Sequence, residues 1–209
     1  MTLLDIAFIA GAYFIGAVPF AYIVAKLVGG VDIRTVGSGN VGATNVGRTL
    51  GRKWGILVFF LDGLKGFLPT FAAWGLYPKA TGLPPVVALT GLAAIAGHNW
   101  PVYLRFKGGK GMATSAGVFL AIFPAGVGIA FGVWAAVVLL TRYVSVASIC
   151  AAMALLMAAL LQPDPYGAGR YLTAFSALAA VLAIVRHRSN IGRLLRGEEN
   201  KVGSGKRAA

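Results

Sequence analysis

The sequence predicts an all-α integral membrane protein that crosses the bilayer about seven times, with the N-terminus outside and the C-terminus in the cytoplasm. Of its 209 residues, 58% are hydrophobic and only 12% are charged, whereas a soluble domain carries about 25% charged residues. Long uncharged runs can each hold a helix of about 20 apolar residues, which is the length that crosses the hydrocarbon core. These runs lie at 6–25, 80–104, 111–141 and 143–163.

The connections between the runs are short, so we expect one polytopic membrane domain at 1–197 and a polar basic tail at 198–209. The first apolar run is preceded by Asp5 and by no Lys or Arg. That pattern is wrong for a cleavable signal peptide and favours a permanent first helix. The expected helices, in chain order, are 4–28, 54–76, 83–104, 112–141, 144–161 and 170–186.

The second expected helix, at 54–76, contains two charged residues. Asp62 and Lys65 stand three positions apart, so they share one face of a helix. A lone charge at the bilayer centre costs about 2.5–3.5 kcal/mol on insertion scales, so we expect the pair to face protein. Two alternatives stay open: a functional site, and a structural ion pair that fixes helix packing.

The run at 112–141 is too long for one crossing. A continuous helix of this length would extend for roughly 45 Å, well beyond the hydrocarbon core. Its centre carries the turn signals Pro124, Gly126 and Gly128. We therefore expect two short crossings with a bend near 124–128.

Cations are concentrated in alternate connections, and this fixes the expected orientation. The connection at 26–53 holds five Lys or Arg, the one at 105–110 holds three, and the chain from 186 onward holds seven. The connections near 77–85 and 162–170 hold one each. The positive-inside rule places the three cationic segments in the cytoplasm. Because the cations lie between apolar runs and not along one soluble face, the net charge of +13 does not predict a nucleic-acid partner.

The connection before the second helix contains a glycine-rich, polar stretch that predicts a phosphate site. Glycines allow positive φ angles and close approach of the backbone to a ligand, and successive N–H groups in such turns bind anions. Hydroxyl and amide side chains add donors, and the guanidinium of Arg48 matches the geometry of a phosphate. The alternative is a flexible loop between two crossings. The candidate residues are Gly37, Ser38, Gly39, Asn40, Gly42, Thr44, Asn45 and Arg48.

A second glycine-and-cation loop precedes the fourth expected helix, 112–141. Lys110 stands among glycines at the expected start of a helix, where free N–H groups and the positive end of the dipole attract phosphate. The Walker spacing of a P-loop is absent, and a cation cluster that only sets topology is the alternative. The candidate binding residues around Lys110 are Gly108, Gly109, Gly111 and Thr114.

The end of the last expected helix carries a third polar group of residues. His187 and Asn190 are three positions apart and can aim at one ligand, although cations here can also simply anchor the helix at the interface. Two histidines and a single cysteine predict no metal site. We expect no cofactor, and no Gly-x-Ser-x-Gly nucleophile motif is present. An enzyme of this kind lacks an obvious protein base.

Together these motifs resemble the bacterial acyl-phosphate:glycerol-3-phosphate acyltransferases. The resemblance rests on the run at 37–45, the pair Asp62 and Lys65, the loop at 108–111 and the helix end at 186–193. It covers essentially the whole chain, in the same order. It implies a seven-helix membrane fold in the bacterial plasma (inner) membrane, with the active site on the cytoplasmic face.

The resemblance also implies the reaction. A long-chain acyl phosphate donates its acyl group to the sn-1 hydroxyl of glycerol 3-phosphate, within the membrane lipid, and yields lysophosphatidic acid and phosphate in the first step of phospholipid synthesis. The amides of the 37–45 turn, with nearby Asn and Thr side chains, would hold the acyl phosphate. A small transporter or channel for an organic phosphate is the alternative, but it should carry its cations midway along a pore. The residues that the resemblance assigns to glycerol 3-phosphate are Ser38, Arg48, Lys110, His187 and Asn190.

Overall fold

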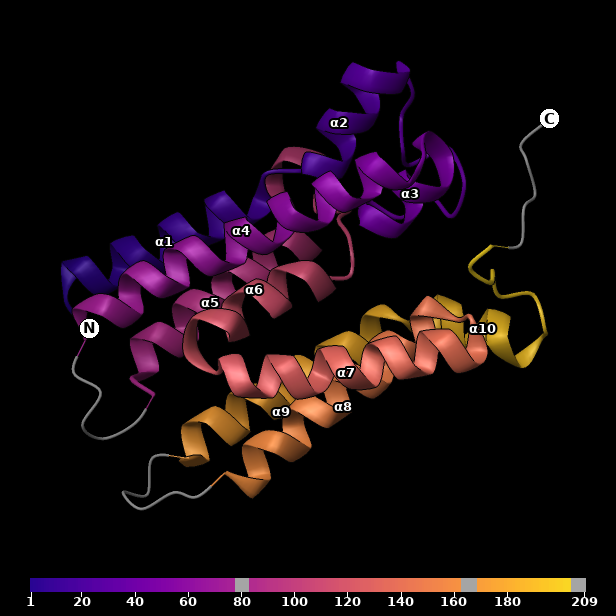
Figure 1. The fold of residues 1–209 in the computed structure, drawn as a ribbon. Helices are drawn as coiled ribbons and strands as arrows, with labels where there is room; N and C mark the ends of the chain where they lie inside the picture. The colour runs from indigo at the N-terminus through magenta and orange to yellow at the C-terminus, as the bar shows by residue number, and fades with distance from the viewer. Residues whose placement is uncertain (78–82, 163–168, 204–209) are drawn as a thin grey trace. The chain divides into compact units, whose positions relative to one another are not determined.

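The computed structural model describes residues 1–77, 83–162 and 169–203, and every regular element in these ranges is helical. The chain forms two compact units, residues 1–123 and 124–209, and each is described by itself (Figure 1). The middle parts of the two connections that we assign to the outer face, 78–82 and 163–168, lie outside the described residues. The same holds for 204–209 of the predicted tail.

In the first unit, a long central helix packs against its neighbours. This helix, α4, contacts α1, α3, α5 and α6, and α1 also packs along α5 (Figure 1). Glycines allow the close approach, because a Cβ atom on Gly16 would overlap Ala94, and one on Gly117 would overlap Gly63. Small residues at contacts are typical of helices that pack in a membrane. The elements are α1 (Leu3–Ala17), α2 (Phe20–Gly29), α3 (Ala43–Leu50), α4 (Arg52–Leu76), α5 (Pro85–Asn99), a 3₁₀ turn (Val102–Leu104) and α6 (Met112–Ile122).

The first predicted helix, 4–28, is wrong as a single helix. The structure ends α1 at Ala17 and begins α2 at Phe20, with Val18 and Pro19 between them. Proline has no N–H to continue the helix, and it biases the preceding residue towards extended backbone. The two helices together still make one apolar stretch, Leu3–Gly29, that is long enough to cross a membrane.

A small apolar core fixes α2 and α3 at one end of α4. It joins Ile33 and Val41 from the connection, Val46 of α3, Val58 of α4 and Leu104 of the 3₁₀ turn. Each of these side chains is at most 6% exposed. Val41 belongs to the first glycine loop, and Leu104 precedes the second one. This core therefore holds both loops to the same end of α4.

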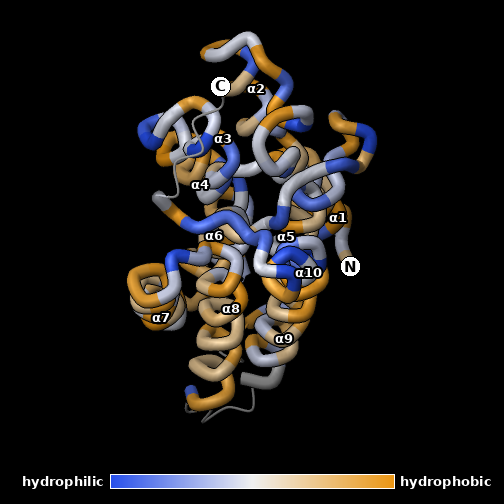
Figure 2. Tube along the Cα trace, turned by 90° about the vertical axis from the view of Figure 1, so that its right-hand side faces the viewer, coloured by the Kyte–Doolittle hydropathy of each residue, from blue (hydrophilic) through white to orange (hydrophobic). Residues whose placement is uncertain are grey.

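In its described residues, 124–162 and 169–203, the second unit consists of three long helices and a short one. Hydrophobic residues run along α7 and α8, whereas hydrophilic residues gather at α10 (Figure 2). The pair formed by α9 and α10 is bent by 53° at His187. The elements are α7 (Pro124–Thr141), α8 (Val144–Leu161), α9 (Gly169–Arg186) and α10 (Arg188–Leu195).

The run 112–141 is interrupted, as predicted, and is not one continuous helix. The helix α6 ends at Ile122 and α7 begins at Pro124, so the break falls at Phe123, one residue before the predicted range. The prediction of 144–161 coincides with α8, and the prediction of 54–76 matches α4 apart from two residues at its start.

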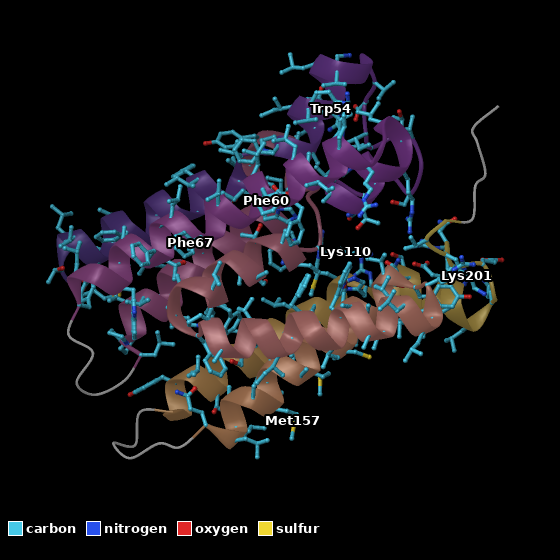
Figure 3. The ribbon with its side chains drawn as sticks, viewed as in Figure 1. Trp54, Phe60, Phe67, Lys110, Met157 and Lys201 are labelled. Atoms are coloured by element: carbon cyan, nitrogen blue, oxygen red, sulfur yellow. The ribbon has the colours of Figure 1, made fainter. Side chains whose placement is uncertain are left out.

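The structure contains several helices that can cross a membrane. Within the described residues, four helical stretches are long and apolar enough, and a fifth is counted if α9 and α10 form one bent span. Large apolar side chains on them are exposed, for example Phe60, 62% exposed, on α4 and Met157, 48% exposed, on α8 (Figure 3). An apolar helix with exposed apolar residues is typical of a lipid-facing span.

Candidate functional site

The first glycine loop is held in shape by one buried side chain, that of Asn45. Asn45 is 1% exposed, and its Oδ1 accepts a hydrogen bond of 2.9 Å from the backbone N–H of Ser38. Its Nδ2 lies 3.1, 3.0 and 3.1 Å from the carbonyl oxygens of Ile33, Val36 and Asn40. The side chain of Asn45 therefore organises the loop, and its predicted role in binding phosphate stays a prediction.

Two glycines of this loop adopt backbone conformations that other residues disfavour. Gly37 and Gly39 have φ angles of 60° and 68°, which is the left-handed region that glycine enters without steric cost. A Cβ atom on Gly37 would also overlap Oδ1 of Asn45. Ser38 stands between the two glycines and is exposed, and its N–H is fixed by the hydrogen bond to Asn45.

The predicted turn at 37–45 is shorter than expected, because α3 begins at Ala43. Within α3, Asn45 and Val46 are buried, whereas Thr44 and Arg48 are exposed. The predicted ligands of the first motif thus come from two settings, a glycine turn at 37–42 and the exposed face of a helix. Gly42 is the N-cap residue of that helix.

Arg34, another cation of this connection, already has a partner. It forms an ion pair of 2.6 Å with Asp32. Hydrogen bonds from the Arg34 side chain and backbone lower the pKa of the Asp32 carboxyl to about 2. Arg34 therefore stabilises the entry to the loop.

The second glycine loop leads directly into α6. Gly111 is the N-cap residue of α6 and has a φ angle of 77°. Lys110 is half-buried immediately before it (Figure 3), and the N–H of Gly109 donates a hydrogen bond of 3.1 Å to the carbonyl oxygen of His98. The predicted placement of Lys110 at the start of a helix is confirmed.

The two glycine loops lie against each other. A Cβ atom on Gly109 would overlap both the carbonyl oxygen of Val41, from the first loop, and Nε2 of His98. Gly108 and Val41 also line one pocket, together with residues of α1, α2, α4 and α5. The structure thus brings together the two loops predicted to bind phosphate, which are more than sixty residues apart in the sequence.

A buried ionic cluster lies beneath these loops. Nζ of Lys65 is 2.7 Å from Oδ1 of Asp62, and Nδ1 of His98 is 3.6 Å from the same oxygen. Lys65 also donates a hydrogen bond of 2.8 Å to the carbonyl oxygen of Val18, where α1 ends. All three ionisable side chains are at most 6% exposed. Sequence reasoning found the pair but missed His98, although an ionisable residue within the third expected helix, 83–104, was a visible signal.

Two further polar side chains near the second loop are buried without a partner in the described part of the protein. These are Asn99, for both side-chain amide atoms, and Thr114, for its Oγ1. Oδ1 of Asn99 would be 2.7 Å from a Cβ on Gly111, so Asn99 faces the start of α6. Thr114, a predicted phosphate ligand, packs its methyl group against Gly66 of α4. Asn99 was not predicted, since an Asn at the end of an apolar run has no distinctive pattern.

In the second unit, His187 and Asn190 are both buried around the bend between α9 and α10. His187 is 2% exposed and is the N-cap residue of α10. Its Nδ1 lies 2.7 Å from the carbonyl oxygen of Ala183, so the Nδ1–H tautomer donates there. Asn190 is 6% exposed, and its Nδ2 donates a hydrogen bond of 2.6 Å to Oε1 of Glu199.

Glu199, from the predicted tail, is the centre of a polar cluster in the second unit. It accepts hydrogen bonds from Ser145 at 2.9 Å and from Arg193 at 2.8 Å, in addition to that from Asn190. Burial raises the pKa of the Glu199 carboxyl, but the hydrogen bonds from Asn190, Ser145 and Arg193 together hold it below its usual value. The tail residues 198–203 that the structure describes are therefore attached to this unit, as is also seen in the hydrogen bond from Val202 N–H to the carbonyl of Arg142.

The predicted residues thus fall into two groups. Ser38, Arg48 and Lys110 lie in the first unit, and His187 and Asn190 lie in the second. Within the described residues no group of three or more His, Cys, Asp or Glu could hold a metal ion.

Comparisons with known proteins agree on one family. The sequence profile of the family described as glycerol-3-phosphate acyltransferase matches residues 6–197. The chain is 46% identical over 191 residues to the glycerol-3-phosphate acyltransferase of Aquifex aeolicus, covering 91% of this chain and 95% of that protein. It is 44% identical over 202 residues to the glycerol-3-phosphate acyltransferase of Desulforudis audaxviator, covering 96% and 98%.

Solved structures show the same relationship. The chain is similar to PlsY, described as an integral membrane glycerol 3-phosphate acyltransferase, in its glycerol 3-phosphate form. That comparison has a TM-score of 0.89 and 43% identity, and covers 96% of both chains. The lysophosphatidic acid form of PlsY matches with a TM-score of 0.87 and 42% identity, again over 96% of both chains.

Proposed function

We propose that this chain, which belongs to the glycerol-3-phosphate acyltransferase family, is a membrane enzyme that transfers a fatty acyl group to glycerol 3-phosphate. The observation that carries the proposal is the contact between the two glycine loops in the first unit. One loop holds Ser38 between two left-handed glycines, and the other presents Lys110 at a helix start. A substrate with a phosphate group matches both kinds of site.

The acyl donor that fits this arrangement is a long-chain acyl phosphate. The sn-1 hydroxyl oxygen of glycerol 3-phosphate attacks the acyl carbon, the new ester bond forms, and the bond from that carbon to the phosphate oxygen breaks. The products are lysophosphatidic acid and inorganic phosphate. The hydroxyl proton passes to the leaving phosphate, so the reaction balances without a protein base.

The residues of the chain contribute position and charge. An acyl phosphate is already activated, so alignment of the two substrates and neutralisation of charge supply most of the acceleration. We assign Arg48 and Lys110 to phosphate oxygens, and the N–H groups of the 37–42 turn to the acyl phosphate. The family resemblance assigns His187 and Asn190 to glycerol 3-phosphate. Their burial at the bend between α9 and α10 gives each a fixed orientation.

We further propose seven crossings in the bacterial inner membrane, with a cytoplasmic active site. The helices α5 and α6 are the short members, with 15 and 11 residues, or about 22 and 16 Å at 1.5 Å per residue. Helices this short can connect the two faces of the bilayer only if the bilayer is locally thinner or if flanking polar side chains extend to the interface. The cationic connection at 26–53 and the loop at 105–110 then lie on the cytoplasmic side.

A transporter for an organic phosphate is not favoured. Such a protein places its binding cations midway along a pore, at broken helices. In the first unit Arg48 lies on α3, outside the long helices, and Lys110 lies before the start of α6. Membership of an acyltransferase family also supports transfer over transport.

The assignment of charge can be tested with Arg48→Ala in purified protein. Removing a charge-assisted contact to phosphate costs about 2–4 kcal/mol, or roughly 30- to 1000-fold in kcat/KM. Lys53→Ala is the matched control, because Lys53 is a cation of the same connection whose Nζ lies 5.1 Å from the ring of Trp54. Equal and mild losses in the two variants would show that Arg48 contributes to topology and not to catalysis.

A further inference from the structure

The buried cluster of Asp62, Lys65 and His98 has no role in the acyl transfer described above. It is nevertheless costly, because charged side chains inside a membrane protein must be desolvated. Asp62 is 2% exposed, Lys65 is 4% exposed and His98 is 6% exposed. Its place in the first unit is distinctive, since all three residues line a pocket that is also lined by Gly108 and Val41 of the two glycine loops.

His98 connects this cluster to the second glycine loop through two separate contacts. Its carbonyl oxygen accepts the N–H of Gly109 at 3.1 Å. Its ring edge at Nε2 abuts the Cα of the same residue, so closely that a Cβ on Gly109 would overlap it. A Cβ on Gly108 would overlap the His98 carbonyl oxygen as well. The position of the His98 ring therefore limits where the backbone before Lys110 can lie.

Asp62 and Lys65 in turn fix the other edge of that ring. Nδ1 of His98 faces Oδ1 of Asp62 at 3.6 Å, an electrostatic contact that is too long for a strong hydrogen bond. Lys65 holds Asp62 at 2.7 Å and ties it to the carbonyl of Val18 at 2.8 Å. The cluster thus runs from the end of α1, through α4 and α5, to the loop before α6.

We infer that Asp62 is a positioning residue, whose side-chain oxygen orients His98 so that its ring and carbonyl hold the Gly108–Gly111 loop in the form that binds the phosphate of glycerol 3-phosphate, while Lys65 balances the buried charge of Asp62. This inference rests on the proposed function only for the identity of the ligand. For the pair Asp62 and Lys65 it favours the functional alternative, in which the pair acts on substrate binding only through His98. The other alternative, an ion pair that only locks helix packing, leads to different results in the following experiment.

The test replaces the ion pair by an apolar pair, D62L/K65M. Exchanging a buried ion pair for apolar residues of similar volume is often neutral or stabilising, so this variant should melt in detergent at or above the temperature of the parent. The dissociation constant for glycerol 3-phosphate, measured by calorimetry, should nevertheless rise about 10- to 100-fold, the range found when partners that orient a metal ligand are removed. The KM for glycerol 3-phosphate should rise with it.

The matched control is D62N/K65M, which also removes both charges and the Lys65 contact to Val18, but leaves an oxygen facing Nδ1 of His98. It should bind glycerol 3-phosphate nearly as well as the parent. Parent-like binding by folded D62L/K65M would overturn the inference, and so would equal loss of binding in the two double variants.

A third variant covers the case in which neither double variant folds. His98→Gln leaves the Asp62–Lys65 pair intact, so weak binding at the parent's melting temperature supports the inference and parent-like binding overturns it. Because binding is measured apart from turnover, a parent that binds glycerol 3-phosphate without transferring an acyl group refutes the proposed function alone. A parent that does not bind it overturns both.

Discussion

Replacing Asn45 with alanine tests whether one buried side chain holds the first glycine loop. Asn45 makes a hydrogen bond to Ser38 N–H at 2.9 Å, and its Nδ2 lies within 3.1 Å of the carbonyl oxygens of Ile33, Val36 and Asn40. The two hydrogens of Nδ2 supply at most two full hydrogen bonds among those three carbonyls. The substitution therefore removes three hydrogen bonds, which at about 0.5–1.5 kcal/mol each amounts to roughly 2–4 kcal/mol.

This loss falls on the loop that we assign to phosphate binding. We expect Asn45→Ala to lower the apparent melting temperature in detergent and to weaken acyl phosphate binding by at least about tenfold, since about 1.4 kcal/mol corresponds to a factor of ten. Asn45→Asp keeps the acceptor for Ser38 but directs a carboxylate at three carbonyl oxygens, so it should be at least as damaging. Thr49→Ala, at an exposed position of the same helix, should stay within about 0.5 kcal/mol of the parent. An Asn45→Ala protein with the parent's melting temperature and affinity would refute the reasoning.

Three further predictions concern charge, pH and topology. Lys110→Ala should reduce kcat/KM by roughly 30- to 1000-fold. Lys107→Ala, in the same loop but exposed, should change it little. Similar losses of kcat/KM in the two variants would contradict the assignment of Lys110 to substrate phosphate. The folded-state pKa of Glu199 lies below its unfolded value, so its contribution to stability is present above pH about 4.5 and is lost as the pH falls through the lower, folded-state value. Glu199→Gln should therefore reduce the fall of the melting temperature over this acidic pH range. An unchanged pH dependence of the melting temperature would exclude Glu199 as its source. In a protein without its native cysteine, a cysteine at the exposed position 125 should react with an impermeant reagent from outside the cell and one at position 204 only after permeabilisation. Outside labelling at 204 would overturn the seven-crossing topology.

The helices that sequence alone predicts well are those that apolar length defines. The prediction of 144–161 coincides with α8, because no charge or proline interrupts that run. The break at Val18 and Pro19 was not predicted, because the apolar residues on both sides of it suggested one continuous helix. The proline itself was a local signal for the break. The helix α3 was predicted as part of a turn, because its eight residues include a glycine, an asparagine and two threonines, all of which have low helix propensity.

The candidate site divides in the same way. The glycine turn and the position of Lys110 at a helix start follow from local patterns, and the structure has both. The contact of Gly109 with Val41 and His98 could not be predicted, because it joins segments of three different elements through tertiary packing. The same holds for Glu199, which a polar tail gives no reason to bury and which the structure places at the centre of three hydrogen bonds.

The measurement that tests the account most directly is the release of inorganic phosphate from acyl phosphate by the purified protein, with and without glycerol 3-phosphate. We predict phosphate release that requires glycerol 3-phosphate and matches, mole for mole, the lysophosphatidic acid formed, with acyl-CoA as a poor donor. Phosphate release that does not depend on glycerol 3-phosphate, or equal turnover with acyl-CoA, would contradict it.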